Sequence, residues 1–341
     1  MRKPSESSRF GASLMLHSRF AGWALSAATL VVVFVVLKNL PAAENSSNSS
    51  ASKPARILFV TQSFGFKHSA VTRKGGQLAP AEQAVTDWAK SSNLFTVDCT
   101  QDVLKDLTKE NLQNYDIVMF YTTGTRKQWP VDDAILDYLC KDWAKQKGHA
   151  FIGVHSATDT LEDYQPYWEM IGGSFNQHPW TSKSKVAVIV DDPEHPICKP
   201  WGKEFTITDE IYQIKNWQPE KVHELMSLDI GHSVFNKDVK NKITQPYHVP
   251  IAWCKEFGDG RVFYISLGHN ESVWADPRYR DCLLAAIKWA RGEISGTATP
   301  NPNVTAALIE KGNSDVAAKL EEFAAQEAAV KEAADKKQNE K

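Results

Sequence analysis

The stretch FIGVHSATD, residues 151–159, decides the fold class of this chain. Its apolar start predicts a buried strand that runs directly into His155. In an α/β protein, ligands are held and chemistry takes place at the carboxyl ends of the central strands. A glycine two residues before His155, with small residues after it, is typical of a nucleophile elbow whose central residue is exposed. Histidine stands where Ser or Cys would attack, which argues against a covalent mechanism.

Strands and helices alternate on both sides of this stretch. Short strands are expected at 56–61, 95–99, 116–121, 150–154 and 185–190, and helices at 80–91, from Pro130 onward, around 163–171 and at 276–291. A hairpin is expected from strands 251–257 and 261–267. Residues 193–249 are less regular and are expected to form an insertion that roofs the sheet. The alternation predicts an α/β fold with a doubly wound, mostly parallel sheet.

Residues 1–43 are expected to form an amino-terminal signal anchor or signal peptide. Four basic residues precede the uncharged run 20–37. That run just reaches the length of a membrane-spanning helix, about 18 residues, and is longer than the usual core of a signal peptide. The small residues at 40–43 offer a cleavage site, but an uncleaved anchor is favoured. In both cases the remainder is exported, and is either membrane-anchored or periplasmic (extracytoplasmic).

The rest of the chain divides into three parts by composition. Residues 44–55 are expected to form a disordered polar linker, 56–296 the α/β domain, and 297–341 a charged, partly helical tail. Within the tail, residues 314–341 are rich in Ala, Glu and Lys and predict a solvated helix outside the active domain.

Composition and missing motifs exclude several classes of function. A formal net charge of −2, without a basic stripe, gives no reason to expect a nucleic-acid partner. The chain has no G-x-G-x-x-G fingerprint, P-loop or H-E-x-x-H helix, so no nucleotide cofactor is expected. Its five cysteines show no metal-finger spacing and predict buried thiols, with one disulfide left open. The oligomeric state is also left open.

Four histidines end strands or lie in loops beside glycine or proline: His68, His155, His178 and His269. Because the carboxyl ends of parallel strands share one edge, we expect His68 and His155 to face one crevice. Whether His269 joins them depends on the direction of the last strand. Such a group suits binding of a divalent metal such as zinc by all four histidines, acid–base catalysis, or sugar binding together with indole rings. Nearby carboxylates are Asp159, Glu162, Glu210 and Glu271, and Glu210 is expected either to point into the crevice or to remain solvated.

Taken together, several motifs resemble the trehalose-utilisation (ThuA-like) family over about 56–292. They are GVHS at 153–156, GGSF at 172–175 followed by HPW at 178–180, DEIY at 209–212, and GRVFY at 260–264 through His269. The resemblance implies a flavodoxin-like, class I glutamine amidotransferase-like three-layer sandwich. In that superfamily the elbow carries a cysteine and a later His-x-Glu completes a triad. Here His269-Asn-Glu271 is similar to the His-x-Glu, but His155 replaces the cysteine, so glutaminase activity is not expected.

Two functions follow from these residues. The first is an exported, carbohydrate-directed enzyme without a cysteine nucleophile, a hydrolase, lyase or isomerase of glycosides or 3-keto-sugars. Its catalytic candidates are His155, His269, Glu210 and Glu271, and its substrate-binding candidates are His178, Trp180, Asp159 and Tyr212. The second is a non-catalytic sugar-binding or scaffold module at the cell surface, which would depend on Trp129, Trp180, Trp217 and Trp274.

Overall fold

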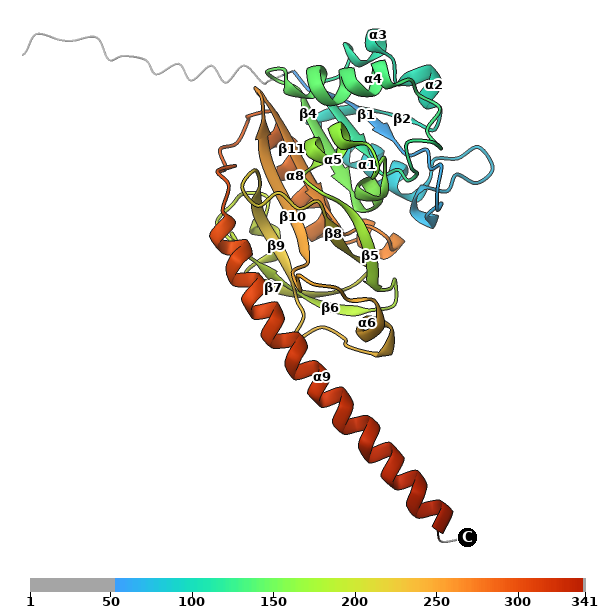
Figure 1. The fold of residues 1–341 in the computed structure, drawn as a ribbon. Coiled ribbons are helices and arrows are strands. Elements are labelled where there is room, and N and C mark those ends of the chain that lie inside the picture. Colours follow the sequence, from blue (N-terminus) through green and yellow to red (C-terminus); the bar gives the residue numbers. More distant parts are fainter. Residues whose placement is uncertain (1–52, 340–341) are drawn as a thin grey trace, which may run out of the picture. The chain divides into compact units, whose positions relative to one another are not determined.

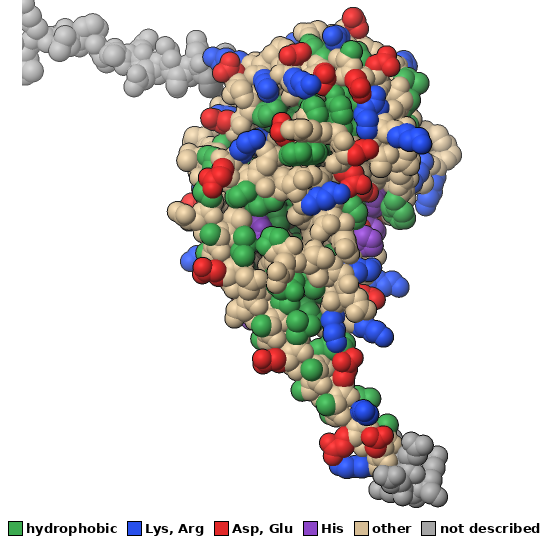
Figure 2. Space-filling view, in the orientation of Figure 1, with side chains coloured by type: hydrophobic (Ala, Val, Ile, Leu, Met, Phe, Trp, Pro, Cys, Tyr) green, Lys and Arg blue, Asp and Glu red, His purple; other side chains and the backbone are tan. Residues whose placement is uncertain are grey.

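The computed structural model describes residues 53–339. The expected targeting segment and most of the polar linker therefore lie outside the described residues. Within 53–339, no helix has both the length and the apolar character needed to cross a membrane. On the face shown in Figure 2, acidic and basic side chains are interspersed, in keeping with the small formal net charge of −2.

A nine-stranded mixed sheet forms the centre of the domain (Figure 1), in the order β2-β1-β3-β4-β11-β10-β9-β6-β7. Neighbouring strands are parallel from β2 (Phe95–Thr100) through β1 (Ala55–Val60), β3 (Ile117–Phe120) and β4 (Ala150–Val154) to β11 (Gly260–Ile265). Antiparallel pairing continues the sheet through β10 (Pro250–Phe257), β9 (His223–Asp229), β6 (Lys185–Val190) and β7 (Glu204–Thr208). The parallel strands bring their carboxyl ends to one edge.

Apolar side chains cover both faces of the parallel strands. On β1, Ile57 and Phe59 belong to one buried cluster, and Leu58 and Val60 belong to another. Successive residues of a strand point to opposite faces, so each face of the sheet has its own core. The doubly wound, three-layer prediction is confirmed. Strand β3 is buried at every position, as its fully apolar sequence predicts.

Local signals mark the starts of two of the expected helices. Helix α1 (Pro80–Ser92) and α8 (Pro277–Ala290) both open with proline. The others are α2 (Val103–Asp106), α3 (Lys109–Leu112), α4 (Asp133–Asp137), α5 (Gln165–Ile171), α6 (Lys237–Lys242), α7 (Glu271–Trp274) and α9 (Pro302–Asn339). The single helix expected from Pro130 is instead broken after α4. A wider turn at Tyr138–Asp142 and a 3-10 turn at Trp143–Lys145 follow it, with Leu139, Cys140 and Trp143 all buried.

The prediction that residues 193–249 form an insertion that roofs the sheet is wrong in part. Strands β7 and β9 belong to the main sheet, where β6 pairs with both of them. Only β8 (Ile211–Lys215) lies apart, in a two-stranded sheet with β5 (Ser174–Trp180). Strand β9 was not predicted, because its sequence contains polar residues although all its positions are buried. Its Glu224 is bonded to Nε2 of His248 at 2.6 Å and to the hydroxyl of Thr305 at 2.6 Å.

Two further expectations need correction. The disulfide left open is not formed, because all five cysteines are free and four of them are buried. The carboxyl-terminal helix begins at Pro302, earlier than expected, and its first turns pack on the domain. Val316 is buried, and Nζ of Lys311 lies 2.8 Å from a carboxylate oxygen of Asp229 on β9. Beyond 321 most side chains of α9 are exposed, as the composition predicts.

Candidate metal and acid–base site

His155 follows β4 directly and forms a strained elbow. Its φ of 46° lies in the left-handed region that side chains rarely adopt. The hydroxyl of Tyr264 on β11 donates to the carbonyl of His155 at 2.6 Å and holds the turn. A Cβ on Gly153 would lie 2.7 Å from Ile171 and 2.9 Å from Tyr264, so only glycine fits below the elbow. Contrary to expectation, the imidazole of His155 is buried rather than exposed.

Four side chains from separate parts of the chain converge at this elbow. His68 follows β1, His155 follows β4, Glu210 lies between β7 and β8, and His269 follows β11. One ligand atom from each lies within 4.8 Å of all the others. We call these four residues the His/Glu cluster. His269 joins it because β11 runs parallel to β4, with Ile265 beside Val154 at the shared edge.

The spacing within the His/Glu cluster suits a bound cation. Nε2 of His155 lies 3.2 Å from Nε2 of His68 and 3.6 Å from a carboxylate oxygen of Glu210. Nε2 of His269 lies 3.7 Å from the same oxygen. Ligand atoms about 2.0–2.1 Å from a tetrahedral zinc ion are about 3.3–3.4 Å apart, close to these distances. The described residues can therefore hold a divalent metal here.

The protonation states agree with metal binding. Nδ1 of His155 lies 2.8 Å from the carbonyl of Ser266, which can only accept, so in the neutral ring Nε2 carries the lone pair. Burial, and then repulsion from the other three histidines, lowers the pKa of His68 far below 6.5. Burial opposes ionisation of Glu210, but its hydrogen bond with His155 and the charges of the histidines lower its pKa overall. Neutral imidazoles and an anionic carboxylate are the forms that bind zinc.

Three other predicted residues border the His/Glu cluster. Nδ1 of His178 lies 3.4 Å from the second carboxylate oxygen of Glu210, and the ring is 44% exposed. The hydroxyl of Tyr212 lies 3.5 Å from Nε2 of His68. Burial and then the charge on Glu162 raise the pKa of Asp159 to about 7, while attraction to His155 opposes that rise. A carboxyl group with such a pKa can take up or release a proton near neutral pH.

Several predicted residues lie elsewhere. Trp180 is buried in the core, where its indole N–H donates to the carbonyl of Val234 at 2.9 Å. Glu271 is exposed at the start of α7 and lines a surface groove with Thr72 and Gln83, outside the His/Glu cluster. Among the other tryptophans considered for sugar stacking, Trp129 and Trp274 are buried, whereas Trp217 is partly exposed.

Sequence reasoning missed the residue that fixes the His269 loop. Asp209 is fully buried, and its carboxylate accepts from the backbone N–H groups of Gly268 at 2.7 Å and Asn270 at 2.9 Å. These two groups flank His269. Burial raises the pKa of Asp209, whereas the charge of His155 and both backbone hydrogen bonds oppose that rise. The DEIY motif at 209–212 contained the signal, since Asp209 directly precedes the ligand candidate Glu210.

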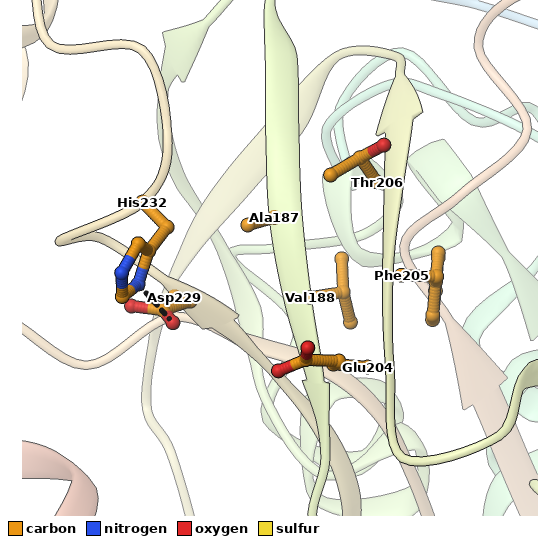
Figure 3. A pocket seen from close by; sticks show the side chains of 7 residues that line it. All are labelled: Ala187, Val188, Glu204, Phe205, Thr206, Asp229 and His232. Carbon is orange, nitrogen blue, oxygen red and sulfur yellow. Dashed lines mark hydrogen bonds and ion pairs between the residues drawn. The ribbon is translucent and has the colours of Figure 1, made fainter.

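A separate pocket of about 320 Å³ lies over β6 and β7 (Figure 3). Two of its ionisable side chains pair with each other, because Nδ1 of His232 lies 2.8 Å from a carboxylate oxygen of Asp229, and Glu204 is the third. Within residues 53–339, the His/Glu cluster is the one group of metal-ligating side chains with converging ligand atoms. We therefore place the candidate site at the elbow.

The fold and the elbow together define a three-layer α/β sandwich with a buried histidine directly after the central strand β4. The ThuA family model, described as trehalose utilisation, matches residues 56–290, and the chain belongs to this family. The resemblance drawn from the motifs is thereby confirmed.

Solved structures of similar proteins support the same fold. A putative ThuA-like protein from Bacteroides uniformis is 21% identical, with a TM-score of 0.53, covering 76% of this chain and 98% of that chain. Another from Parabacteroides merdae is 14% identical, with a TM-score of 0.50, covering 74% and 99%. No curated protein matches the chain significantly.

Proposed function

We propose that this protein is a metal-dependent enzyme that acts on carbohydrates, as a hydrolase, lyase or isomerase of glycosides or 3-keto-sugars. One observation carries the proposal: ligand atoms of three histidines and Glu210 converge within 4.8 Å of one another at the carboxyl ends of the parallel strands. The family's description as trehalose utilisation supports a carbohydrate substrate. Histidine at the elbow argues against a covalent acyl-enzyme route.

The chemistry expected of this site is proton transfer next to a carbonyl. A divalent cation held by the His/Glu cluster would supply Lewis-acid polarisation of a substrate oxygen. A base of the protein takes the proton from the carbon beside the carbonyl. The resulting enediolate has two fates. If a proton returns to the former carbonyl carbon and the adjacent hydroxyl proton moves to the former carbonyl oxygen, the ketone shifts to the adjacent carbon and the sugar is isomerised. If the glycosidic oxygen is expelled instead from the carbon beside the deprotonated one, that oxygen takes up a proton and leaves as an alcohol, and the sugar becomes an unsaturated ketone.

Asp159 and His178 are the residues we assign to proton transfer. The pKa of Asp159 is raised to about 7, so its carboxyl group exchanges protons at neutral pH. His178 contacts Glu210, and its ring remains accessible to solvent because the side chain is half-exposed. Both border the His/Glu cluster without belonging to it, as groups that handle protons rather than hold a cation would.

Metal content and turnover test this function together. The full-length protein should contain about one divalent metal per chain and convert a 3-keto-disaccharide, and His155→Ala should do neither. Equal turnover by both proteins would remove His155 from the mechanism. A metal-free protein with full activity would exclude metal dependence, and calorimetric sugar binding without product would favour the non-catalytic module.

We further propose that the domain is exported, through residues 1–43. The basic residues before the uncharged run 20–37 support an orientation in which the amino terminus stays in the cytoplasm and the domain lies outside it. Protease added to cells whose outer envelope has been permeabilised should degrade the domain, because export places it outside the cytoplasmic membrane. If the domain in such permeabilised cells is fully protected from the protease, export is contradicted.

A further inference from the structure

Phe66 lies between the His/Glu cluster and solvent. Its ring meets that of the buried His68 edge-on, with 4.8 Å between ring centroids, yet the residue is 66% exposed. The exposed large hydrophobic residues among 53–339 include Leu78, Leu104, Val234, Leu320 and Val330, and Phe66 is the one aromatic in that set. An isolated exposed apolar residue is ordinary. An exposed aromatic ring in contact with a candidate metal ligand is a different case.

The loop that carries Phe66 is held firmly. The hydroxyl of Thr123 donates to the carbonyl of Phe66 at 2.8 Å and accepts from the N–H of Gly65 at 3.1 Å. The N–H of Phe64 donates to the carbonyl of Thr123 at 3.0 Å. Gly124 packs against this loop so closely that a Cβ would lie 2.9 Å from Cβ of Phe64. The ring of Phe66 is therefore presented to solvent by a fixed backbone.

Further groups lie near His178 and Asp159, the two residues assigned to proton transfer. The rings of Phe175 and His178 lie nearly parallel, 21° apart with centroids 6.1 Å from each other. Nζ of Lys215 and a carboxylate oxygen of Glu162 lie 2.8 Å apart, and both charges act on Asp159. A sugar ring has C–H faces that pack on aromatic rings and hydroxyls that bind charged side chains. The surroundings offer both kinds of contact.

We propose that Phe66 is the platform on which a sugar ring of the substrate stacks, so that its reacting carbon faces the His/Glu cluster. This inference rests on the proposed function, because it takes the ligand to be a carbohydrate. It adds a substrate-positioning residue that neither holds the cation nor transfers a proton. Because the ring contacts the ring of His68, a sugar stacked on it would lie next to a residue of the His/Glu cluster.

The test compares Phe66→Ala with Phe66→Tyr in the full-length, metal-loaded protein. Calorimetric titration uses trehalose and its 3-keto derivative as probes. Phe66→Ala should weaken sugar binding about threefold to tenfold, the usual range for an aromatic contact, and Phe66→Tyr should bind like the wild type. Leu104→Ala removes another exposed apolar side chain, 64% exposed on α2, and should change nothing.

Each outcome separates this inference from the function it rests on. Unchanged sugar binding by Phe66→Ala, with normal binding by the wild type, would overturn the platform and leave the enzyme proposal intact. Loss of bound metal in Phe66→Ala would also overturn it, because Phe66 would then merely support His68. If the wild type itself binds and converts neither sugar, the carbohydrate function fails, and the platform fails with it.

Discussion

Nε2 of His68 and Nε2 of His155 lie 3.2 Å apart, although 87 positions separate the residues in the chain. The bond from Nδ1 of His155 to Ser266 leaves a lone pair on Nε2 of the neutral ring. His68 is neutral at pH 7, because burial keeps its pKa far below 6.5. Two such nitrogens at this distance must share either a proton or a cation. Glu210, 3.6 Å from His155, adds the negative charge that favours a cation.

Replacing a ligand of the His/Glu cluster should therefore abolish tight metal binding. In metalloproteins, loss of a residue that hydrogen-bonds to a metal ligand typically lowers metal affinity about 10- to 100-fold. We expect His68→Ala and His155→Ala, which remove the ligands themselves, to lower it at least as much. Metal analysis after dialysis and competition with a chelator would measure this. His232→Ala is the matched control, because His232 is an exposed histidine paired with Asp229. Equal metal content in all four proteins would contradict the site.

Asp209→Asn should weaken the same metal without contacting it. The carboxylate accepts from two backbone N–H groups around His269, and an amide would turn an N–H donor toward one of them. We expect about a 10- to 100-fold loss of affinity and a changed visible spectrum of the cobalt-substituted protein. Asp229→Asn, which alters a carboxylate outside the His/Glu cluster, should leave both readouts unchanged. A spectrum identical to that of the wild type would show that Asp209 does not position His269.

The sequence predicted the parallel half of the sheet well, for a simple physical reason. Strand β4 was expected at 150–154 and is found there, because a short apolar run that contains Phe, Ile and Val and follows Gly148 is too short for a buried helix. Strand β9 was missed, because its polar residues are satisfied by partners distant in sequence. Glu224 is paired with His248 and Thr305, and no local pattern announces such contacts.

The site was only partly predictable for a related reason. The types of the ligands were visible, since His68, His155 and His269 each follow a strand. The choice between Glu210 and Glu271 was not, because it depends on side-chain direction. Glu271 begins a helix and faces solvent, whereas Glu210 lies between two strands and is buried against the histidines. The direction of β11 and the exposure of Phe66 could be seen only in the folded structure.

Tyr264→Phe should destabilise the elbow. The hydroxyl donates to the carbonyl of His155, and without it a buried acceptor loses its donor in a strained turn. We expect the free energy of unfolding to fall by about 1–3 kcal/mol, with weaker metal binding because His155 moves. Urea unfolding and metal titration would measure the two effects. Tyr115→Phe removes a hydroxyl bonded to Asp98 and should spare the metal site. If both variants bind metal equally well, Tyr264 does not hold His155 in place.

Lys255→Met should make stability less dependent on pH. Burial, and then the charge of Lys221, lowers the pKa of Lys255 from 10.5 to about 8. Between these values the unfolded chain binds more protons than the folded one, so this lysine makes the free energy of unfolding rise with pH. Below pH 8 the buried charge costs up to about 3 kcal/mol. Methionine removes that cost and keeps the length of the side chain, although the bond from Nζ to the carbonyl of Glu169 is lost.

Urea unfolding at pH 7 and pH 9.5 would measure this effect. Lys255→Met should be more stable than the wild type at pH 7, and its advantage should shrink as the pH approaches 10. Lys90→Met is the control, because Lys90 is an exposed lysine on α1 whose replacement should leave the pH dependence of the wild type unchanged. Parallel pH profiles for the wild type and Lys255→Met would mean that Lys255 has the same pKa in the folded and unfolded chains.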